Sequence, residues 1–194
     1  MENNVDLPKN GDVQKEESWW ELIRFAIIVL IIAIGVRVFV AQPFIVSGAS
    51  MVPTFQDHNY LIVDEISYRF EKPQRGDVII FHPPGQPTGI YYIKRIIGLP
   101  GETIKITAGK VSIINSEHPD GFVLDEPYLK NISYETMSKT LGTSEYFVMG
   151  DNRPESSDSR VWGTLPAQNI VGRAFLRLLP FTDVGVFPGT YHSY

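Results

Sequence analysis

Ser50 stands in a sequence context that favours nucleophilic chemistry. It follows Gly48 by two residues and precedes Pro53 by three. Glycine lets another backbone approach closely, and proline keeps the residue before it out of the helical region. A serine at such a point can present its hydroxyl outward, with backbone N–H groups nearby to hold an oxyanion. On this stretch alone, an ordinary loop serine is the alternative.

Lys94 lies in a run of residues, 91–97, that is typical of a β-strand. Alternate side chains of a strand share a face, so Lys94 is expected beside Tyr92 and Ile96. Burial among such residues lowers the pKa of a lysine, as a lysine general base requires. At the reference pKa of about 10.4, only ~0.1% of the amine is neutral near pH 7.5. A lysine whose amine reaches water is the more common arrangement.

Residues 149–163 form the third unusual stretch, because they combine hydroxyl, carboxylate and guanidinium groups in a short span. Such a composition fits a hydrogen-bonded loop built on Asx turns and an Asp–Arg pair. It equally fits a shell of residues that holds a catalytic group in place. The local sequence leaves both interpretations open.

Composition excludes several kinds of site. The 194 residues include no cysteine, which excludes disulfides, thiolate zinc sites, iron–sulfur clusters and a cysteine nucleophile. The four histidines are scattered without an i, i+4 pair, so no metal site is expected. The net charge of −5 provides no basic surface for phosphates, so no nucleic acid is expected as a partner.

The apolar residues 22–41, which precede these groups, are predicted to form a transmembrane anchor helix. Twenty helical residues span roughly 30 Å, the thickness of a bilayer core. Trp19 and Trp20 lie where interfacial aromatic residues occur, and Arg24 and Arg37 lie near the two ends. A cleaved secretory signal and a buried core helix are the alternatives. The long acidic segment before the stretch opposes a signal, and the lack of a polar face opposes a core helix.

Basic residues predict the orientation of this anchor. Lys9, Lys15 and Arg24 come before or at the start of the span, while Arg37 stands at its exit. The positive-inside rule therefore predicts a single-pass protein of the plasma membrane, with a cytoplasmic N-terminus and the rest of the chain on the extracytoplasmic side. Residues 1–21 are polar and are expected to be disordered.

The remaining residues, 42–194, are expected to form a mostly β domain with an antiparallel β-sheet or barrel-like arrangement. Short runs of β-type residues alternate with Gly and Pro clusters. The predicted strands cover residues 60–66, 77–81, 89–98, 103–107, 110–114, 145–150 and 170–179. Residues 115–144 are richer in polar side chains and are predicted to be an excursion from the sheet.

Taken in order, these stretches resemble the motifs of bacterial type I signal peptidases, which are serine peptidases with a Ser/Lys dyad. The matching segments after the anchor are SMVPT (50–54), RGDV (75–78), KRIIGLPGE (94–102) and residues 150–163. Each motif alone is modest, but four in order after a membrane span form a specific pattern. The resemblance covers most of the chain, and residues of about 102–145 correspond to the family's variable insertion.

The resemblance implies a membrane-bound serine endopeptidase that removes N-terminal signal peptides from exported preproteins. It implies Ser50 as the nucleophile and Lys94 as the general base, acting through an acyl-enzyme without a metal or an organic cofactor. Ser156 matches the serine that hydrogen-bonds and orients the lysine, while Asp158 and Arg160 match a supporting ion pair. The substrate pocket of the family corresponds here to four apolar residues, namely Phe44, Val46, Met51 and Tyr92.

This chain departs from some members of the family two residues before the nucleophile. Those members carry a serine whose hydroxyl helps to hold the oxyanion, and this chain has Gly48. The oxyanion must then rely on the Ser50 backbone N–H and a second donor, for which Ser47 is a candidate.

Two other functions stay open on the sequence. Another Ser/Lys self-cleaving peptidase, of the repressor type, would lack a membrane span and need a DNA-binding segment, and neither condition fits. A membrane-tethered β-domain could act as a non-catalytic binding module, which the intact Ser50 and Lys94 oppose. The expected partners are preproteins that carry signal peptides, together with the lipid bilayer; the oligomeric state stays open.

Overall fold

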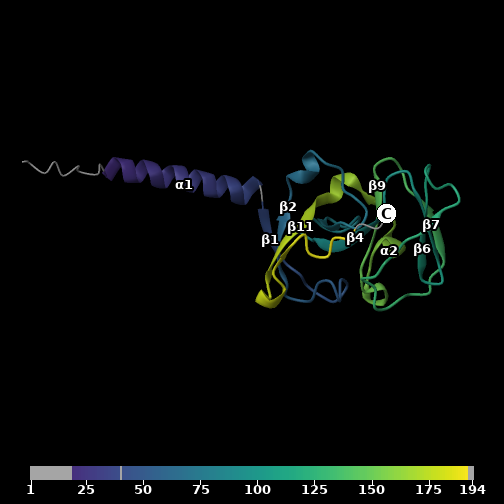
Figure 1. Ribbon diagram of the computed structural model, residues 1–194. Coiled ribbons are helices and arrows are strands. Elements are labelled where there is room, and N and C mark those ends of the chain that lie inside the picture. The colour runs from purple at the N-terminus through teal and green to yellow at the C-terminus, as the bar shows by residue number, and fades with distance from the viewer. Residues whose placement is uncertain (1–18, 40, 192–194) are drawn as a thin grey trace, which may run out of the picture. The chain divides into compact units, whose positions relative to one another are not determined.

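The computed structural model describes residues 19–39 and 41–191 (Figure 1). Contacts divide the chain after Val36 into two compact units; the described part of the first is helical, and the second is a β-rich domain. Of the segment predicted to be disordered, residues 1–18 lie outside the described residues. Residues 19–21 are helical, so the prediction of disorder is wrong for them.

The helix α1 (Trp19–Phe39) begins three residues before the predicted anchor. The carboxylate of Glu21 in its first turn favours this early start, since it faces the positive end of the helix dipole. The predicted helix also extends too far, because Ala41 already belongs to a strand. Pro43 disfavours helical backbone at the residue before it, which is consistent with a change of structure here.

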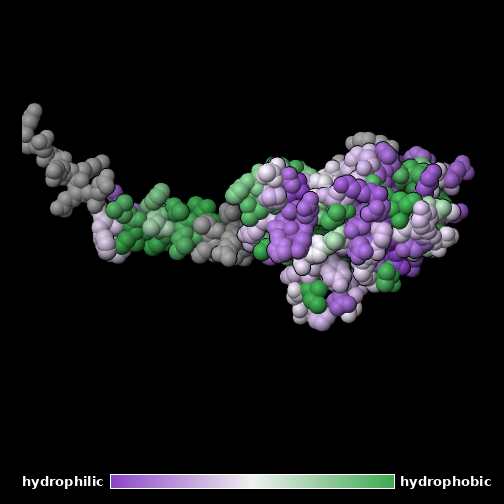
Figure 2. All heavy atoms as spheres, turned by 90° about the horizontal axis from the view of Figure 1, so that it is seen from below, coloured by the Kyte–Doolittle hydropathy of each residue, from purple (hydrophilic) through white to green (hydrophobic). Residues whose placement is uncertain are grey.

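The side chains of α1 are largely apolar. Large apolar residues are exposed at nearly every position from 25 to 32, so no polar stripe separates them (Figure 2). Among the described residues, no helix combines the length and the apolar character needed to cross a membrane.

The β-rich domain contains two antiparallel sheets, as expected for a mostly β fold. In spatial order the larger sheet consists of β1 (Ala41–Ile45), β2 (Tyr60–Asp64), β11 (Ile170–Leu179), β3 (Val78–Phe81), β4 (Tyr92–Gly98), β9 (Glu145–Met149) and β10 (Leu165–Pro166), with β12 (Gly185–Val186) paired to β11. The last long strand of the chain, β11, therefore lies between β2 and β3. The hairpin of β1 and β2 is hydrogen-bonded to the rest of the sheet through β11.

The smaller sheet consists of β7 (Phe122–Val123), β6 (Lys110–Ile114), β5 (Thr103–Thr107) and β8 (Met137–Thr140), in that order. Its central strands occupy the predicted ranges 103–107 and 110–114, and their side chains alternate: Ile104 and Ile106 of β5 are buried while Lys105 is exposed. Residues 115–144 do not all leave the sheet, because β7 and β8 lie within them. Both strands are too short for a clear alternating pattern.

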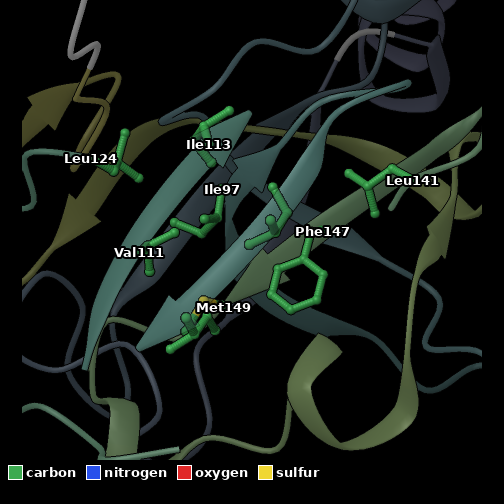
Figure 3. Packing of buried hydrophobic residues seen from close by; sticks show 9 residues of the cluster. Ile97, Val111, Ile113, Leu124, Leu141, Phe147 and Met149 are labelled. Atoms are coloured by element: carbon green, nitrogen blue, oxygen red, sulfur yellow. The ribbon is translucent and has the colours of Figure 1, made fainter. Parts of the chain in front are cut away.

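A buried apolar cluster joins the two sheets (Figure 3). Ile97 of β4 and Phe147 and Met149 of β9 pack against Val111 and Ile113 of the smaller sheet. The smaller sheet therefore packs against β4, the strand that carries Lys94, and against β9, the strand that ends just before residue 150.

Short helical turns complete the domain. They are η1 (Ser67–Arg69), η2 (Arg153–Glu155), α2 (Ser159–Trp162), η3 (Ala167–Asn169) and η4 (Phe181–Asp183). Both η2 and α2 lie in the polar stretch 149–163, which is therefore a structured loop after β9.

Candidate active site

Ser50 lies in the loop between β1 and β2, close to a glycine in a left-handed conformation. Gly48 has a φ of +90°, which glycine adopts without strain. Its N–H donates to Asp57 Oδ1 at 2.9 Å, while the Ser50 carbonyl accepts from the Asn152 N–H at 3.0 Å. These two bonds hold the loop on both sides of the Ser50 hydroxyl.

Lys94 lies on β4 with its amine against that hydroxyl. Its Nζ atom donates to Ser50 Oγ at 2.6 Å and to the Ile93 carbonyl at 2.9 Å. Lys94 is only 4% exposed, and Nζ lies 5.5 Å from the centroid of the Tyr92 ring. The amine is therefore withdrawn from water, in contrast to most strand lysines.

Burial lowers the pKa of Lys94 to about 8, because the charged ammonium loses hydration. The carboxylates of Asp158 and Asp151 favour the charge and oppose this shift in part, while Arg160 adds to it. With a pKa of about 8, roughly a tenth of the amine is neutral at about pH 7, compared with ~0.04% for an ordinary lysine.

The loop after β9 is held together by a buried ion pair. Asp158 accepts a hydrogen bond from the Gly150 N–H at 3.0 Å. Its two oxygens accept from Arg160 at 2.8 Å each, so the ion pair expected of these residues is present. Arg160 also donates to the carbonyls of Arg153 and Ser156. The pair therefore ties the beginning of the loop to its end.

The Ser156 hydroxyl is buried beside Gly150 and the Ser50 carbonyl. A side chain at Gly150 would place its Cβ 2.3 Å from Ser156 Oγ and 2.5 Å from the Ser50 carbonyl oxygen. Within the part of the chain that the structure describes, the Ser156 hydroxyl has no hydrogen-bond partner. The bond to Lys94 that the resemblance implies is therefore not formed, because Lys94 donates to Ser50 and Ile93 instead.

A cavity of about 270 Å³ opens at Ser50 and Lys94. Phe44, Val46 and Tyr92, three of the residues implied for the substrate pocket, line it. Met51 does not, since it is buried in the core cluster that also contains Val46. Six lining residues were not anticipated from the sequence, namely Ile45, Leu61, Ile80, Tyr91, Ile93 and Ser157.

Tyr91 forms one wall of this cavity. Its ring packs against Phe44, with ring centroids 5.1 Å apart, and against His82, with centroids 4.5 Å apart. The alternating pattern predicts Tyr91 on the face opposite Lys94. In the structure β4 begins only at Tyr92, so the alternation does not extend to Tyr91.

One backbone N–H near Ser50 is available to hold an oxyanion. The Gly48 N–H is occupied by Asp57, whereas the Ser50 N–H has no acceptor among residues 41–191. The hydroxyl-bearing residues Ser47 and Ser157 both line the cavity. The arrangement therefore offers a nucleophile, a partly neutral amine and donors for a developing negative charge. No group of three or more His, Asp and Glu side chains in the described ranges could hold a metal ion.

A comparison with protein families matches residues 19–179 to a model described as signal peptidase, peptidase S26. Among curated proteins, a probable signal peptidase I-1 from Synechocystis sp. is 40% identical over 179 residues, which cover 87% of this chain and 88% of that protein. A signal peptidase I from Leptolyngbya laminosa is 39% identical, with 80% of this chain and 77% of that protein covered.

A solved structure is also similar. It is the crystal structure of a signal peptidase I from Enterococcus faecalis V583, with 34% sequence identity and a TM-score of 0.45. The match covers 53% of this chain and 97% of that one.

Proposed function

The chain belongs to the signal peptidase family, peptidase S26, and on this premise we propose that it removes N-terminal signal peptides from exported preproteins with a Ser/Lys dyad. It is a serine peptidase and hence a hydrolase. We assign Ser50 as the nucleophile and Lys94 as the general base. The observation that carries this assignment is the 2.6 Å contact between Ser50 Oγ and Lys94 Nζ in a largely apolar cavity.

Acylation begins when neutral Lys94 takes the proton of the Ser50 hydroxyl and Ser50 Oγ bonds to the scissile carbonyl carbon. The carbonyl oxygen becomes an oxyanion, held by the Ser50 N–H and by a hydroxyl from Ser47 or Ser157. Lys94 then gives its proton to the amide nitrogen as the carbon–nitrogen bond breaks. The mature protein leaves with a free amino group, and the signal peptide stays esterified to Ser50.

Deacylation uses the same two side chains. Neutral Lys94 takes a proton from water, whose oxygen bonds to the ester carbon. The bond from that carbon to Ser50 Oγ then breaks, and Ser50 recovers a proton from Lys94. The signal peptide leaves with a carboxyl group, and no metal or organic cofactor takes part in this scheme.

Ser156, Asp158 and Arg160 are proposed to support the dyad. The Asp158–Arg160 ion pair holds the loop that contacts the Ser50 carbonyl. The Ser156 hydroxyl, which has no partner in the described part of the chain, is free to turn toward Lys94 and orient the amine.

The cavity supports a preference for small substrate side chains. At about 270 Å³, with aromatic walls from Phe44, Tyr91 and Tyr92, it is too confined for several large residues at once. Met51 supports Val46 from the core cluster rather than from the cavity. Small residues before the scissile bond, as in the A-x-A-like sites that the resemblance implies, fit this space.

We further propose that the helical part of the predicted anchor 22–41, residues 22–39, tethers the protein to the plasma membrane. Residues 1–21 would then be cytoplasmic, and residues 42–194 would form the extracytoplasmic peptidase domain. The support is the apolar stretch and the distribution of Lys and Arg around it. Recovery of the full chain in the supernatant after membrane sedimentation would contradict the tether, and protease access to the N-terminus of intact cells would contradict the orientation.

Cleavage of a preprotein in detergent tests the dyad. Ser50→Ala and Lys94→Ala should abolish cleavage, and Ser156→Ala should reduce it. Ser138→Ala and Lys105→Ala are matched controls, because both side chains are exposed and lie opposite each other on β8 and β5. Cleavage by Ser50→Ala at the wild-type rate would overturn the assignment. A wild-type protein that cuts no preprotein would favour a non-catalytic binding module.

A further inference from the structure

Residues 125–135, here called the strap, connect β7 to β8 and contact three buried arginines around the proposed active site. These are Arg95, Arg153 and Arg160, whose side chains are at most 4% exposed. A buried guanidinium is stable only when its charge and its N–H groups are matched by partners. Residues of the strap supply some of the partners of each of the three guanidinium groups.

Glu126 is the most buried charged contact of the strap. It forms an ion pair with Arg153 in which the two side chains are 6% and 2% exposed. Tyr128 donates its hydroxyl to Glu126 Oε1 at 2.8 Å, which orients the carboxylate. Because neither charge reaches water, each depends on the other.

Arg153 connects Glu126 to the turn after β9, which contacts Ser50. Its Nε donates to the Gly150 carbonyl at 3.1 Å. Gly150 packs so closely against the Ser50 carbonyl that no side chain fits between them, and the nearby Asn152 N–H donates to that same carbonyl. A path of direct contacts therefore leads from Glu126 to the nucleophile.

The strap also contacts the strand that carries Lys94. The Tyr128 ring lies 3.9 Å from the guanidinium carbon of Arg95, the residue after Lys94. Arg95 in turn is paired with Asp151 in the same turn after β9. One tyrosine thus bridges the base-bearing strand and the carboxylate of Glu126.

The far end of the strap closes on the supporting ion pair. Arg160 donates to Ser133 Oγ at 2.6 Å and to Glu135 Oε2 at 2.9 Å, in addition to its bonds with Asp158. Glu135 is half-exposed, so this contact is weaker than that of Glu126.

Both ends of the strap are fixed to the smaller sheet. Leu124, just before it, belongs to the core cluster in Figure 3 and donates its N–H to the Val111 carbonyl at 2.8 Å. After it, β8 pairs with β5. The smaller sheet therefore holds the strap at a defined position relative to the larger one.

We propose that the strap sets the geometry between nucleophile and base, with Glu126 as its principal positioning residue acting through Arg153. This inference rests on the proposed Ser50–Lys94 peptidase. A displacement of about 1 Å in a catalytic group can cost ~100-fold in rate. Loss of the Glu126 charge should therefore lower kcat by about tenfold to 100-fold, while KM changes by less than about twofold because the cavity walls are untouched.

The test compares full-length Glu126→Gln with Glu117→Gln in detergent, using a signal-peptide substrate. Glu117 lies in the same insertion and is exposed, and within the described ranges it hydrogen-bonds only through its backbone N–H, to Asn115. Active enzyme is counted by the acyl-enzyme burst, and kcat is expressed per active site so that unfolded protein does not contribute. Tyr128→Phe removes only the hydroxyl that orients Glu126. It should also lower kcat, but by a smaller factor than Glu126→Gln does.

A double-mutant cycle with Arg153→Gln completes the test. If Glu126 acts through Arg153, the double variant should lose little more kcat than either single variant. A lower melting temperature with unchanged kcat per active site in both Glu126→Gln and Tyr128→Phe would overturn the proposal. Failure of the peptidase assignment is recognised separately, because Ser50→Ala would then cut as wild type does.

Discussion

Cleavage should rise with pH as Lys94 loses its proton. Burial lowers the pKa of Lys94 to about 8, and only the neutral amine can accept the proton of Ser50. We expect kcat/KM to reach about half of its maximum near pH 8, about a tenth near pH 7 and ~1% near pH 6. The rate rises with pH because the protonated ammonium form of Lys94 cannot accept a proton, whereas the neutral amine can.

A fluorogenic signal-peptide substrate, assayed in detergent from about pH 6 to 10, measures this profile. His82 is the competing origin for the acidic limb, because its ring contacts Tyr91 at the cavity wall. His82→Gln should therefore leave the midpoint near 8. A midpoint well below that of Lys94 that vanishes in His82→Gln would refute the role of Lys94. A midpoint near about 10 would refute the effect of burial.

Three further outcomes follow from the same structure. Gly150→Ala should lower kcat by ~100-fold, because the added Cβ would overlap Ser156 Oγ and the Ser50 carbonyl oxygen; kcat within twofold of wild type would contradict the crowding. Asp151→Ala leaves the Arg95 charge buried and unpaired, so urea unfolding should show a loss of ~3–5 kcal/mol in the free energy of unfolding. Burial alone would raise the pKa of Glu102, but hydrogen bonds from Arg75, Asn115 and the Leu99 N–H outweigh it and lower the pKa. The stability from Glu102 is therefore present above its ordinary pKa and lost as the pH falls through the lowered one. In Glu102→Gln the melting temperature should therefore fall less steeply with decreasing pH than in wild type. An equally steep fall in both proteins would contradict this role of Glu102.

Short runs of β-type residues between Gly and Pro clusters predicted most of the sheet. Each of the seven predicted strands forms, and each overlaps the observed strand closely. The signal is strong there because β-branched and aromatic residues gather in short runs that Gly and Pro interrupt. It misses the short strands β7, β8, β10 and β12, and it misses β1, whose first residue belongs to the predicted anchor helix. It also extends to Tyr91, one residue before β4 begins.

Sequence reasoning singled out Ser50 and Lys94 but not the contacts that bring them together. The expected neighbours of Lys94 follow from its own strand, whereas its contact with Ser50 joins residues 44 positions apart. Glu126 and Arg153 are 27 positions apart, and their polar surroundings in the sequence predict exposure rather than burial. Only the packing of the smaller sheet on the larger one brings these charges together and removes them from water.

The position of β11 bears on when the enzyme becomes active during its synthesis. Ser50 belongs to the β1–β2 hairpin and Lys94 to β4, and β11 joins these two parts of the larger sheet. Since β11 is translated after both proposed catalytic residues, a nascent chain carries the proposed nucleophile and base before it carries the strand that joins their two parts of the sheet. The unfinished peptidase should therefore remain inert beside other emerging polypeptides, and completion of β11 becomes the step that switches proteolysis on.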